Sequence, residues 1–270
     1  MPNNHTQPLV PPRGKKFDLD DYSPGYSGAY DRARAEAEIV PLRIRLNDLQ
    51  DVLYADRRFS LLIVLQGIDT AGKDGTIKSV FQQVGPLGCS VSNFGVPTDE
   101  ELGHDFLWRY HQRTPKKGSV VIFNRSHYEA VLVERVKNLA PKETWQGRYD
   151  QINQFEDLLS RSGTVIMKFF LHISKDEQKE RLQARLDEPE HRWKFNAGDL
   201  EDRKLWDEYE KAYETALERC SSKHAPWRIV PADKKWRRNA IVASIVRGVL
   251  EDMDPRYPTP SWKPGDFKIE

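Results

Sequence analysis

The chain has 270 residues, enough for one large domain or two small ones with a substantial hydrophobic core. Its 42 basic and 41 acidic residues leave a formal net charge of +1, which argues against a protein that coats DNA. No apolar run approaches the roughly 20 residues of a membrane helix, and the N-terminal residues lack the apolar core of a secretory signal. The two cysteines have neither a pairing pattern nor metal-ligand spacing, so we expect a cytoplasmic protein. From the net charge and the lack of a long apolar run, we expect that it binds neither nucleic acids nor membranes.

The N-terminal part of the chain divides into an arm and a helical region. Residues 1–28 are rich in proline, glycine and tyrosine, and we expect an extended arm. From about residue 29 to 56, leucines recur every three or four positions, from Leu42 to Leu53, which predicts an amphipathic helix. Pro41 lies inside this region, so we expect either two helices or one bent helix.

The strongest motif lies between residues 61 and 75. Five apolar residues, Leu61 to Leu65, suit a strand buried on both faces, and the pattern is helical from Lys73 onward. The segment between them reads Gly67-Ile-Asp-Thr-Ala-Gly-Lys-Asp-Gly75, and strand, Gly-x4-Gly-Lys, helix is typical of a phosphate-binding loop. Its amides, the helix N-terminus and the Lys73 ammonium then face anionic oxygens. The alternative is a glycine-rich turn that binds nothing.

Two carboxylates belong to this loop and indicate a metal. Asp74 stands where such loops usually have a serine or threonine that helps to hold Mg²⁺, and a carboxylate can take that part. Asp69 is the second acid. Both would repel a phosphate unless a cation lay between them, so we expect Asp69 and Asp74 to be metal ligands.

Strands and helices alternate along the rest of the chain. We expect further strands at 89–94, 119–123, 164–171 and 227–230, and helices at 98–113, 131–136, 142–160, 174–187, 199–220 and 234–253. A capping box at Thr98 and a cap at Ser174 begin two of these helices. The inward residues of helix 98–113 should be Leu102, Phe106, Leu107 and Tyr110, and the run from Lys234 to Arg238 is interpreted as exposed charge at a helix start. The alternation predicts a three-layer α/β fold with a five-stranded parallel sheet, a single domain over 29–253 and an irregular tail from 254 to 270.

The ends of the strands supply further candidates, because ligands of such sheets bind at the carboxyl ends of the strands. The strand beside the loop strand usually ends in an acid that orders Mg²⁺, but here it ends in Asn124, which we expect to contact metal-bound water. Arg125 is either a phosphate clamp or half of a structural ion pair. Glu129 is either an acid near the metal or an acid that favours a helix start.

Two other groups of residues flank the predicted site. Arg181 and Arg185 share one helix face, and Arg192 and Lys194 follow beyond Pro189, so a lid at about 180–200 or a solvated charged helix is expected. Asp105, Trp108 and Arg109 can border a nucleotide, although Trp108 fits a hydrophobic core equally well.

Taken together, these motifs resemble the polyphosphate kinase type 2 family over about residues 30 to 258. The motifs are Gly67–Gly75, Phe94-Gly-Val-Pro-Thr98 with His104–Arg109, Phe123-Asn-Arg-Ser-His-Tyr-Glu129, and Phe170–Ser174 leading to Glu180–Arg185 and Arg192–Phe195. The resemblance implies a fold like that of thymidylate kinase, transfer of phosphoryl groups between inorganic polyphosphate and nucleotides with Mg²⁺ or Mn²⁺, and a homo-oligomer, either a dimer or a tetramer. The run from Asn124 to Glu129 resembles the branch that includes single-domain enzymes accepting both AMP and ADP.

The resemblance and the residues together give a set of expected roles. Catalytic roles fall to Asp69, Lys73, Asn124, Arg125 and Glu129. Phosphate binding falls to Gly67, Ala71, Gly72, Lys73, Asp74, Gly75, Arg181, Arg185, Arg192 and Lys194. Nucleotide binding falls to Phe94, Val96, Pro97, Thr98, Asp105, Trp108 and Arg109. We expect direct in-line transfer with the polymer over residues 67–75. The rivals are an ATP-dependent nucleoside or small-molecule kinase and a nucleotide-dependent switch.

Overall fold

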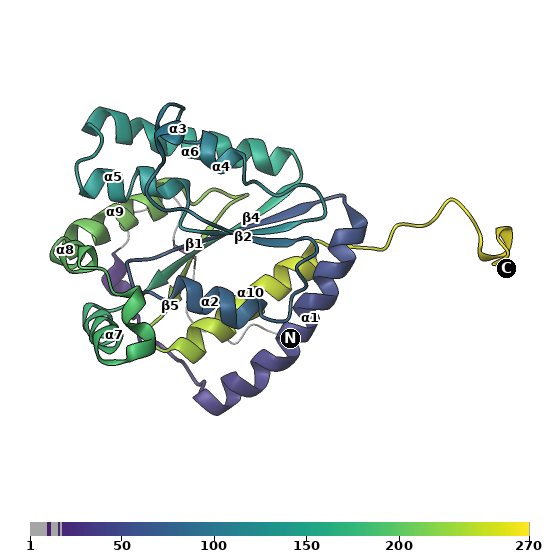
Figure 1. The fold of residues 1–270 in the computed structure, drawn as a ribbon, viewed down its shortest axis with the longest axis horizontal. Coiled ribbons are helices and arrows are strands. Elements are labelled where there is room, and N and C mark those ends of the chain that lie inside the picture. Colours follow the sequence, from purple (N-terminus) through teal and green to yellow (C-terminus); the bar gives the residue numbers. More distant parts are fainter. Residues whose placement is uncertain (1–9, 12–15, 17, 270) are drawn as a thin grey trace.

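Five strands form one parallel sheet, as the alternation of strands and helices predicts. In the computed structural model, which describes residues 10–11, 16 and 18–269, they are β1 (Ser60–Gln66), β2 (Cys89–Asn93), β3 (Val120–Asn124), β4 (Thr164–His172) and β5 (Trp227–Pro231), in the order β2-β3-β1-β4-β5 (Figure 1). Every residue of the central strand β1 is buried. A strand that has parallel neighbours on both sides and helices on both faces needs such an unbroken apolar run. The predicted fold class is confirmed.

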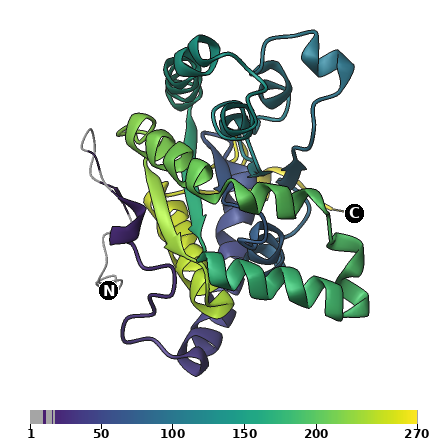
Figure 2. The same cartoon turned by 90° about the vertical axis from the view of Figure 1, so that its left-hand side faces the viewer.

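The register of the strands brings their carboxyl ends together. Leu65 of β1 lies beside Asn124 of β3, and Asn124 lies beside Asn93 of β2. On the other side of β1, His172 of β4 is paired with Pro231 of β5. The segments that follow these strands therefore emerge at one edge of the sheet, and Figure 2 looks onto that edge.

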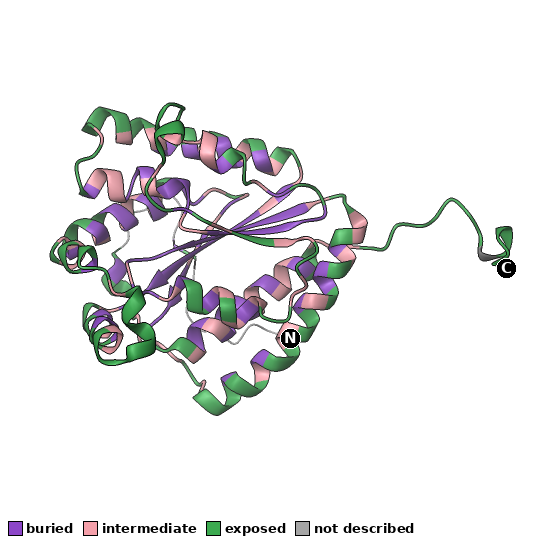
Figure 3. Ribbon diagram, viewed as in Figure 1, coloured by how far each residue is buried: buried purple, intermediate pink, exposed green. Residues whose placement is uncertain are grey.

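Helices cover both faces of the sheet and its carboxyl edge. On one face lie α1 (Arg32–Asp56), α2 (Lys73–Phe81) and α10 (Lys235–Asp252), and the opposite side carries α3 (Asp99–Leu102), α4 (Trp108–His111), α5 (Val133–Val136), α6 (Lys142–Arg161) and α9 (Trp206–Arg219). Beside the carboxyl ends of the strands lie α7 (Lys175–Asp187), the 3-10 turn η3 (Pro189–Lys194) and α8 (Gly198–Lys204). The buried residues are concentrated in the sheet and on the helix sides that face it (Figure 3).

Several predicted helices differ from those observed. The α1 helix is one helix with Pro41 inside it, so the alternative of two helices was wrong. The predicted helix at 98–113 is two short helices: α3 ends at Gly103, whose N–H closes the last turn, and Leu102 is 68% exposed instead of facing inward. The capping box at Thr98 is confirmed. The predicted helix at 199–220 is divided into α8 and α9 at Leu205, whose backbone is not helical.

The remaining segments lie at the periphery. Of the predicted arm, residues 1–9, 12–15 and 17 lie outside the described residues, and the rest includes a 3-10 turn, η1 (Leu19–Asp21). Leu19 is buried and its N–H donates to Glu214 Oε1 at 3.0 Å, so this part of the arm is packed against α9. The tail from Asp254 runs away from the sheet and carries the turn η4 (Pro264–Asp266). Within the described residues, none of the helices is long and apolar enough to cross a membrane.

A buried ion pair fixes the segment that follows β3. Lys168 of β4 donates to Glu156 Oε2 of α6 at 2.6 Å, to the Tyr128 hydroxyl at 2.7 Å and to the Cys220 carbonyl at 2.6 Å. Tyr128 donates to Glu156 Oε1 at 2.9 Å, and His127 lies 3.2 Å from the same oxygen. Burial alone would raise the pKa of Glu156, but the charge of Lys168 and the hydrogen bond with His127 together outweigh burial and hold the pKa below its usual value. His127 and Tyr128, which follow Arg125 closely in the chain, are thereby held in place.

We predict that Lys168→Met destabilises the protein strongly, because it leaves the Glu156 carboxylate buried without its counter-charge. The expected loss is about 3–5 kcal/mol in the free energy of unfolding, measured by urea denaturation. The matched variant is Lys168→Met combined with Glu156→Gln, which removes both charges and should be less destabilised than the sum of the two single variants. If the losses in the free energy of unfolding of the two single variants simply added in the double variant, the ion pair would be contradicted.

Candidate active site

Two glycines shape the loop between β1 and α2. At Gly67 a Cβ would lie 2.8 Å from the Leu171 carbonyl and from Ala71 Cβ, so a side chain has no space between the loop and β4. Gly72 has a φ of 98°, a conformation that residues with a side chain rarely adopt, and it is the N-cap of α2. The first amides of a helix have no acceptor within the helix. They are therefore available to an anion at the start of α2.

The carbonyl groups of this loop are held by side-chain donors. Four N–H groups donate to four loop carbonyls: Lys73 to Gly67 at 2.8 Å, Gln178 to Asp69 at 3.2 Å, Arg181 to Thr70 at 2.9 Å and Arg238 to Ala71 at 3.1 Å. Gln178 and Arg181 come from α7, and Arg238 comes from α10. In a planar trans peptide the C=O and N–H groups point in opposite directions, so holding a carbonyl also orients the next amide.

Charged side chains from two strand ends meet at the loop. Arg125, directly after β3, donates from Nη2 to Asp69 Oδ1 at 2.7 Å, and its Nη1 lies 3.8 Å from Glu129 Oε2. Burial lowers the pKa of Arg125, but the attraction of Glu129 and Asp69 outweighs burial and raises it overall. Burial, and then the charge of Arg125, lower the pKa of Lys73. Lys73 and Arg125 therefore repel one another across the loop, and the carboxylates of Asp69 and Glu129 reduce that repulsion.

Asn124 connects the loop to two strands. Its Nδ2 donates to Asp74 Oδ1 at 2.7 Å and to Asn93 Oδ1 at 2.8 Å. Its own Oδ1 is buried, and no donor among the described residues reaches it. The amide thus fixes Asp74 at the start of α2 and presents an unsatisfied acceptor beside that carboxylate.

The four predicted lid cations lie in two different environments. Arg181 is only 9% exposed, and it bonds to the loop. Arg185 donates to Asp199 Oδ2 at 2.8 Å, and Arg192 donates to the Leu186 carbonyl at 2.9 Å. The Lys194 ammonium lies 5.1 Å from the ring centre of Trp193. The structure therefore brings Arg181 to the loop, whereas the recorded contacts of the other three are made within the segment 185–199.

The predicted nucleotide-binding residues form a unit of their own. Phe94 is buried, with ring centres 4.4 Å from Tyr110 and 4.9 Å from Phe123. Trp108 stacks on His104 at 4.0 Å, and Arg109 donates to the Gly95 carbonyl at 3.2 Å.

The other members of this group are engaged locally or exposed. Thr98 caps α3, Asp105 Oδ1 accepts from the Leu107 amide at 2.9 Å, Val96 is exposed and Pro97 is partly buried. Asp105, Trp108 and His111 line a cavity of about 310 Å³. The hydrogen bonds of these side chains are made among residues 94–111, and the Phe94 amide ties the group to the end of β3 by donating to the Asn124 carbonyl at 3.1 Å.

Three residues at the site were not expected from the sequence. Arg238 belongs to the run interpreted as exposed charge, but it is 2% exposed and bonds to the loop. Gln178 bonds to the loop from α7. Asp199 is buried and accepts a hydrogen bond from Arg185 at 2.8 Å, and burial and then the charge of Asp69 raise its pKa. A single charged residue in a charged helix gives no sequence signal for the direction in which it points.

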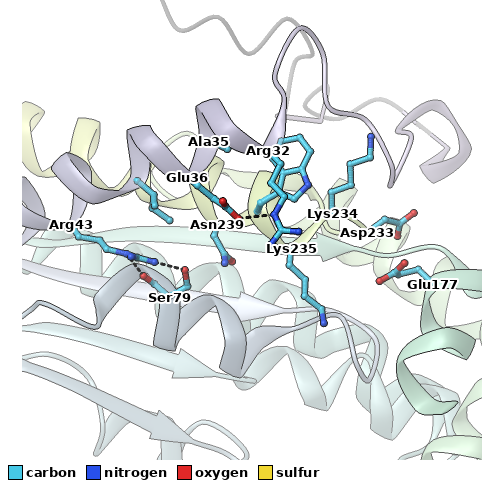
Figure 4. Close-up of a pocket in the computed structure, with 12 residues that line it drawn as sticks. Arg32, Ala35, Glu36, Arg43, Ser79, Glu177, Asp233, Lys234, Lys235 and Asn239 are labelled. Carbon is cyan, nitrogen blue, oxygen red and sulfur yellow. Dashed lines mark hydrogen bonds and ion pairs between the residues drawn. The ribbon is translucent and has the colours of Figure 1, made fainter. Parts of the chain in front are cut away.

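A second cavity lies behind this site, between α1, α2 and α10. It has a volume of about 600 Å³ and is lined by residues such as Ile39, Trp236 and Asn239 (Figure 4). Its cations are largely engaged: Arg32 pairs with Glu36 at 2.7 Å, and Arg43 donates to the Ser79 carbonyl at 2.6 Å. None of the residues 67–75 lines it. This cavity is separate from the loop.

A strand, a glycine loop with its lysine, and a helix at the carboxyl edge of a parallel sheet define a phosphate-loop protein. The sequence profile of the family Polyphosphate kinase 2 (PPK2) matches residues 29–258. The chain belongs to that family, which confirms the resemblance seen in its motifs.

Close relatives cover nearly the whole chain. It is 54% identical over 256 residues to the AMP/ADP-polyphosphate phosphotransferase of Meiothermus ruber, an alignment that covers 95% of each protein. It is 42% identical to the ADP-polyphosphate phosphotransferase of Rhodopseudomonas palustris, over 91% of this chain and 89% of that protein. The crystal structure of Polyphosphate Kinase 2 from Arthrobacter aurescens TC1 is similar with a TM-score of 0.91 and 39% identity, covering 96% of this chain and 93% of the other.

We predict that Gly72→Ala lowers both stability and activity. A Cβ at this position would lie 1.8 Å from Arg238 Nη1, and the φ of 98° is strained for alanine. The expected loss in the free energy of unfolding is about 1–3 kcal/mol, measured by urea denaturation, with a fall in turnover because the loop must shift. Gly248→Ala in α10, where no atom beyond the neighbouring backbone of the helix lies within 4 Å of the added Cβ, is the control and should be neutral or stabilising. Equal behaviour of the two variants would contradict the prediction.

Proposed function

We propose that this protein moves phosphoryl groups between inorganic polyphosphate and AMP or ADP, giving ADP or ATP. The observation that carries the proposal is the meeting of the loop, Lys73 and Arg125 at one edge of the sheet, with carboxylates between the two cations. A linear polymer of phosphates is recognised by such charges and by backbone amides. Acceptance of both AMP and ADP is supported by the 54% identity to a relative that is named for both.

The residues of the site suit direct transfer. Lys73 and the loop amides hold the terminal phosphates of the polymer, and Arg125 grips the phosphoryl group that moves. The oxygen of the nucleotide's terminal phosphate forms a bond to phosphorus as the bond to the rest of the polymer breaks, so the polymer becomes shorter by one phosphate. Positioning and charge neutralisation account for most of the rate of such reactions.

The residues present fit Mg²⁺, with Mn²⁺ as a substitute. Magnesium is usually held by one or two carboxylates together with substrate phosphates and water, and Asp69 and Asp74 supply these carboxylates. The unsatisfied Oδ1 of Asn124 beside Asp74 supplies an acceptor for metal-bound water. When bound, the ion would neutralise charge on the phosphates that react. Glu129 acts through Arg125, which it helps to orient.

We also infer that the protein works as a homo-oligomer, a dimer or a tetramer. Val40 and Ile44 are four residues apart on the outer side of α1 and are 47% and 53% exposed. Val91 on the edge strand β2 is exposed too. An edge strand and an exposed apolar strip are features that a second copy can cover.

The direct test is incubation of the purified protein with ADP, Mg²⁺ and long-chain polyphosphate in the absence of ATP. We predict that ATP forms, and that Lys73→Ala lowers turnover by about a hundredfold or more, because a charged contact to the transferring group is lost. The control is Lys78→Ala, which removes an exposed lysine from the last turn of the same helix and should leave turnover unchanged. Near-normal turnover of the Lys73 variant would remove the loop from the mechanism. Consumption of ATP with a nucleoside, without any reaction with polyphosphate, would favour an ATP-dependent kinase.

We predict that a chelator abolishes turnover and that added Mg²⁺ restores it. Asp69→Asn should raise the Mg²⁺ concentration for half-maximal rate by about ten- to a hundredfold, because a carboxylate ligand is lost. Asp157→Asn, which changes an aspartate paired with Arg161 on α6, is the control and should keep the Mg²⁺ dependence of the original protein. An unchanged Mg²⁺ dependence in the Asp69 variant would exclude this carboxylate as a ligand.

A further inference from the structure

We propose that Arg181 and Arg238 are positioning residues that hold the phosphate loop in its binding shape from outside the site. This inference rests on the proposed role of residues 67–75 in binding phosphate. It assigns to both arginines a function in the reaction although neither touches the substrate. It also gives Arg181 a different part from that of a lid cation.

Arg238 reaches the loop from α10. Its Nη1 donates to the Ala71 carbonyl at 3.1 Å, and its Nε and Nη2 donate to Asn239 Oδ1 at 3.0 and 2.9 Å. The residue is 2% exposed, and the acceptors in its recorded hydrogen bonds are neutral. Burial and then the charge of Arg181 lower the pKa of Arg238 to about 9. Burial of a charged guanidinium costs free energy, and the hydrogen bonds of the guanidinium offset part of that cost. The bond to the loop is therefore the feature of Arg238 that calls for a function.

Arg181 holds the next carbonyl of the loop and joins it to two other elements. Its Nη1 donates to the Thr70 carbonyl at 2.9 Å, and its Nε donates to Glu177 Oε1 at 2.8 Å. Its Nη2 donates to the carbonyls of Ala232 and Asp233, at 2.7 and 2.9 Å, directly after β5. The guanidinium therefore binds the loop, the end of β5 and α7 to one another. Such a fixed group cannot swing over a substrate.

Holding these carbonyls determines where the amides of the loop point. The Ala71 carbonyl faces Arg238, so the N–H of Gly72, in the same peptide unit, points away from α10. The Thr70 carbonyl faces Arg181, and the N–H of Ala71 in that peptide donates back to the Ile68 carbonyl at 3.0 Å, which closes the turn. The arginines thus fix the two peptide planes that precede α2.

Gly72 is packed closely against Arg238. A Cβ on Gly72 would lie 1.8 Å from Arg238 Nη1 and 2.8 Å from its Cζ, so the guanidinium occupies the space that a side chain at position 72 would need. The left-handed conformation of Gly72 is thereby packed directly against the arginine. Two positive charges behind the loop also raise the electrostatic potential at the start of α2, where solvent screening is weak.

The test is Arg238→Gln, with Arg237→Gln as the matched control. Arg237 is the preceding residue on α10 and is equally buried, but it lies over the Tyr30 ring, with 4.3 Å between its Cζ and the ring centre. Both variants are compared at a temperature at which circular dichroism shows both to be folded. The measurements are kcat, KM for polyphosphate, and the Kd for tripolyphosphate by calorimetry in the absence of nucleotide.

We expect Arg238→Gln to lower kcat by about a hundredfold and to weaken tripolyphosphate binding by at least tenfold, because the loop amides lose their alignment. Arg237→Gln should lose a similar amount of thermal stability but keep kcat and Kd within about twofold. Arg238→Lys retains the charge and one donor, so its values should lie between those of Arg238→Gln and the original protein.

One result would overturn the proposal. If Arg238→Gln loses stability as Arg237→Gln does, yet keeps kcat and Kd within about twofold of the original protein, the residue has only a structural role and the proposal is wrong. If Arg238→Gln does not fold, Arg181→Lys provides the same measurements. Failure of the proposed function is distinguishable, because the original protein would then form no ATP from ADP and polyphosphate.

Discussion

The site depends on keeping several positive groups close together although they repel one another. Lys73, Arg125 and the N-terminus of α2 converge on one loop, and the charge of Arg125 contributes to the lowered pKa of Lys73. The ion pair between Arg125 and Asp69 offsets this repulsion in the absence of substrate. Phosphate oxygens can take the place of that acid on Arg125. The charged groups of the site are therefore arranged in advance, and a substrate that binds Arg125 as proposed would replace Asp69 there instead of requiring a new arrangement.

The register of the sheet makes this arrangement possible. Because Leu65, Asn93 and Asn124 lie side by side on neighbouring strands, the short segments that follow them meet within hydrogen-bond distance. Asn124 then bonds to both Asp74 and Asn93. Beneath this layer the buried pair of Lys168 and Glu156 holds Tyr128. The residues before and after Arg125 are therefore held by buried contacts, so the position of Arg125 follows from contacts deep within the fold.

The sequence was informative where a pattern is local and repeated. The apolar run of β1, the glycine spacing of the loop and the cap at Ser174 all specify short-range geometry, and each predicted element is present. The direction of single charged side chains on a helix is decided by tertiary packing. Arg238 and Arg181 therefore appeared as surface or lid charges, whereas they are buried against the loop. The break at Gly103 was missed because Leu102 continued the apolar pattern although no partner covers it.

The position of Arg181 limits which part of the helical segment can move. Its guanidinium binds the loop and the residues after β5, so the first half of α7 is part of the rigid site. The segment beyond it is held by contacts such as those from Arg185 to Asp199 and from Arg192 to Leu186. The charges of Asp69 and Arg125 both act on the carboxyl group of Asp199. A polyanion that binds Arg125 would repel Asp199 and favour release of Arg185 from it.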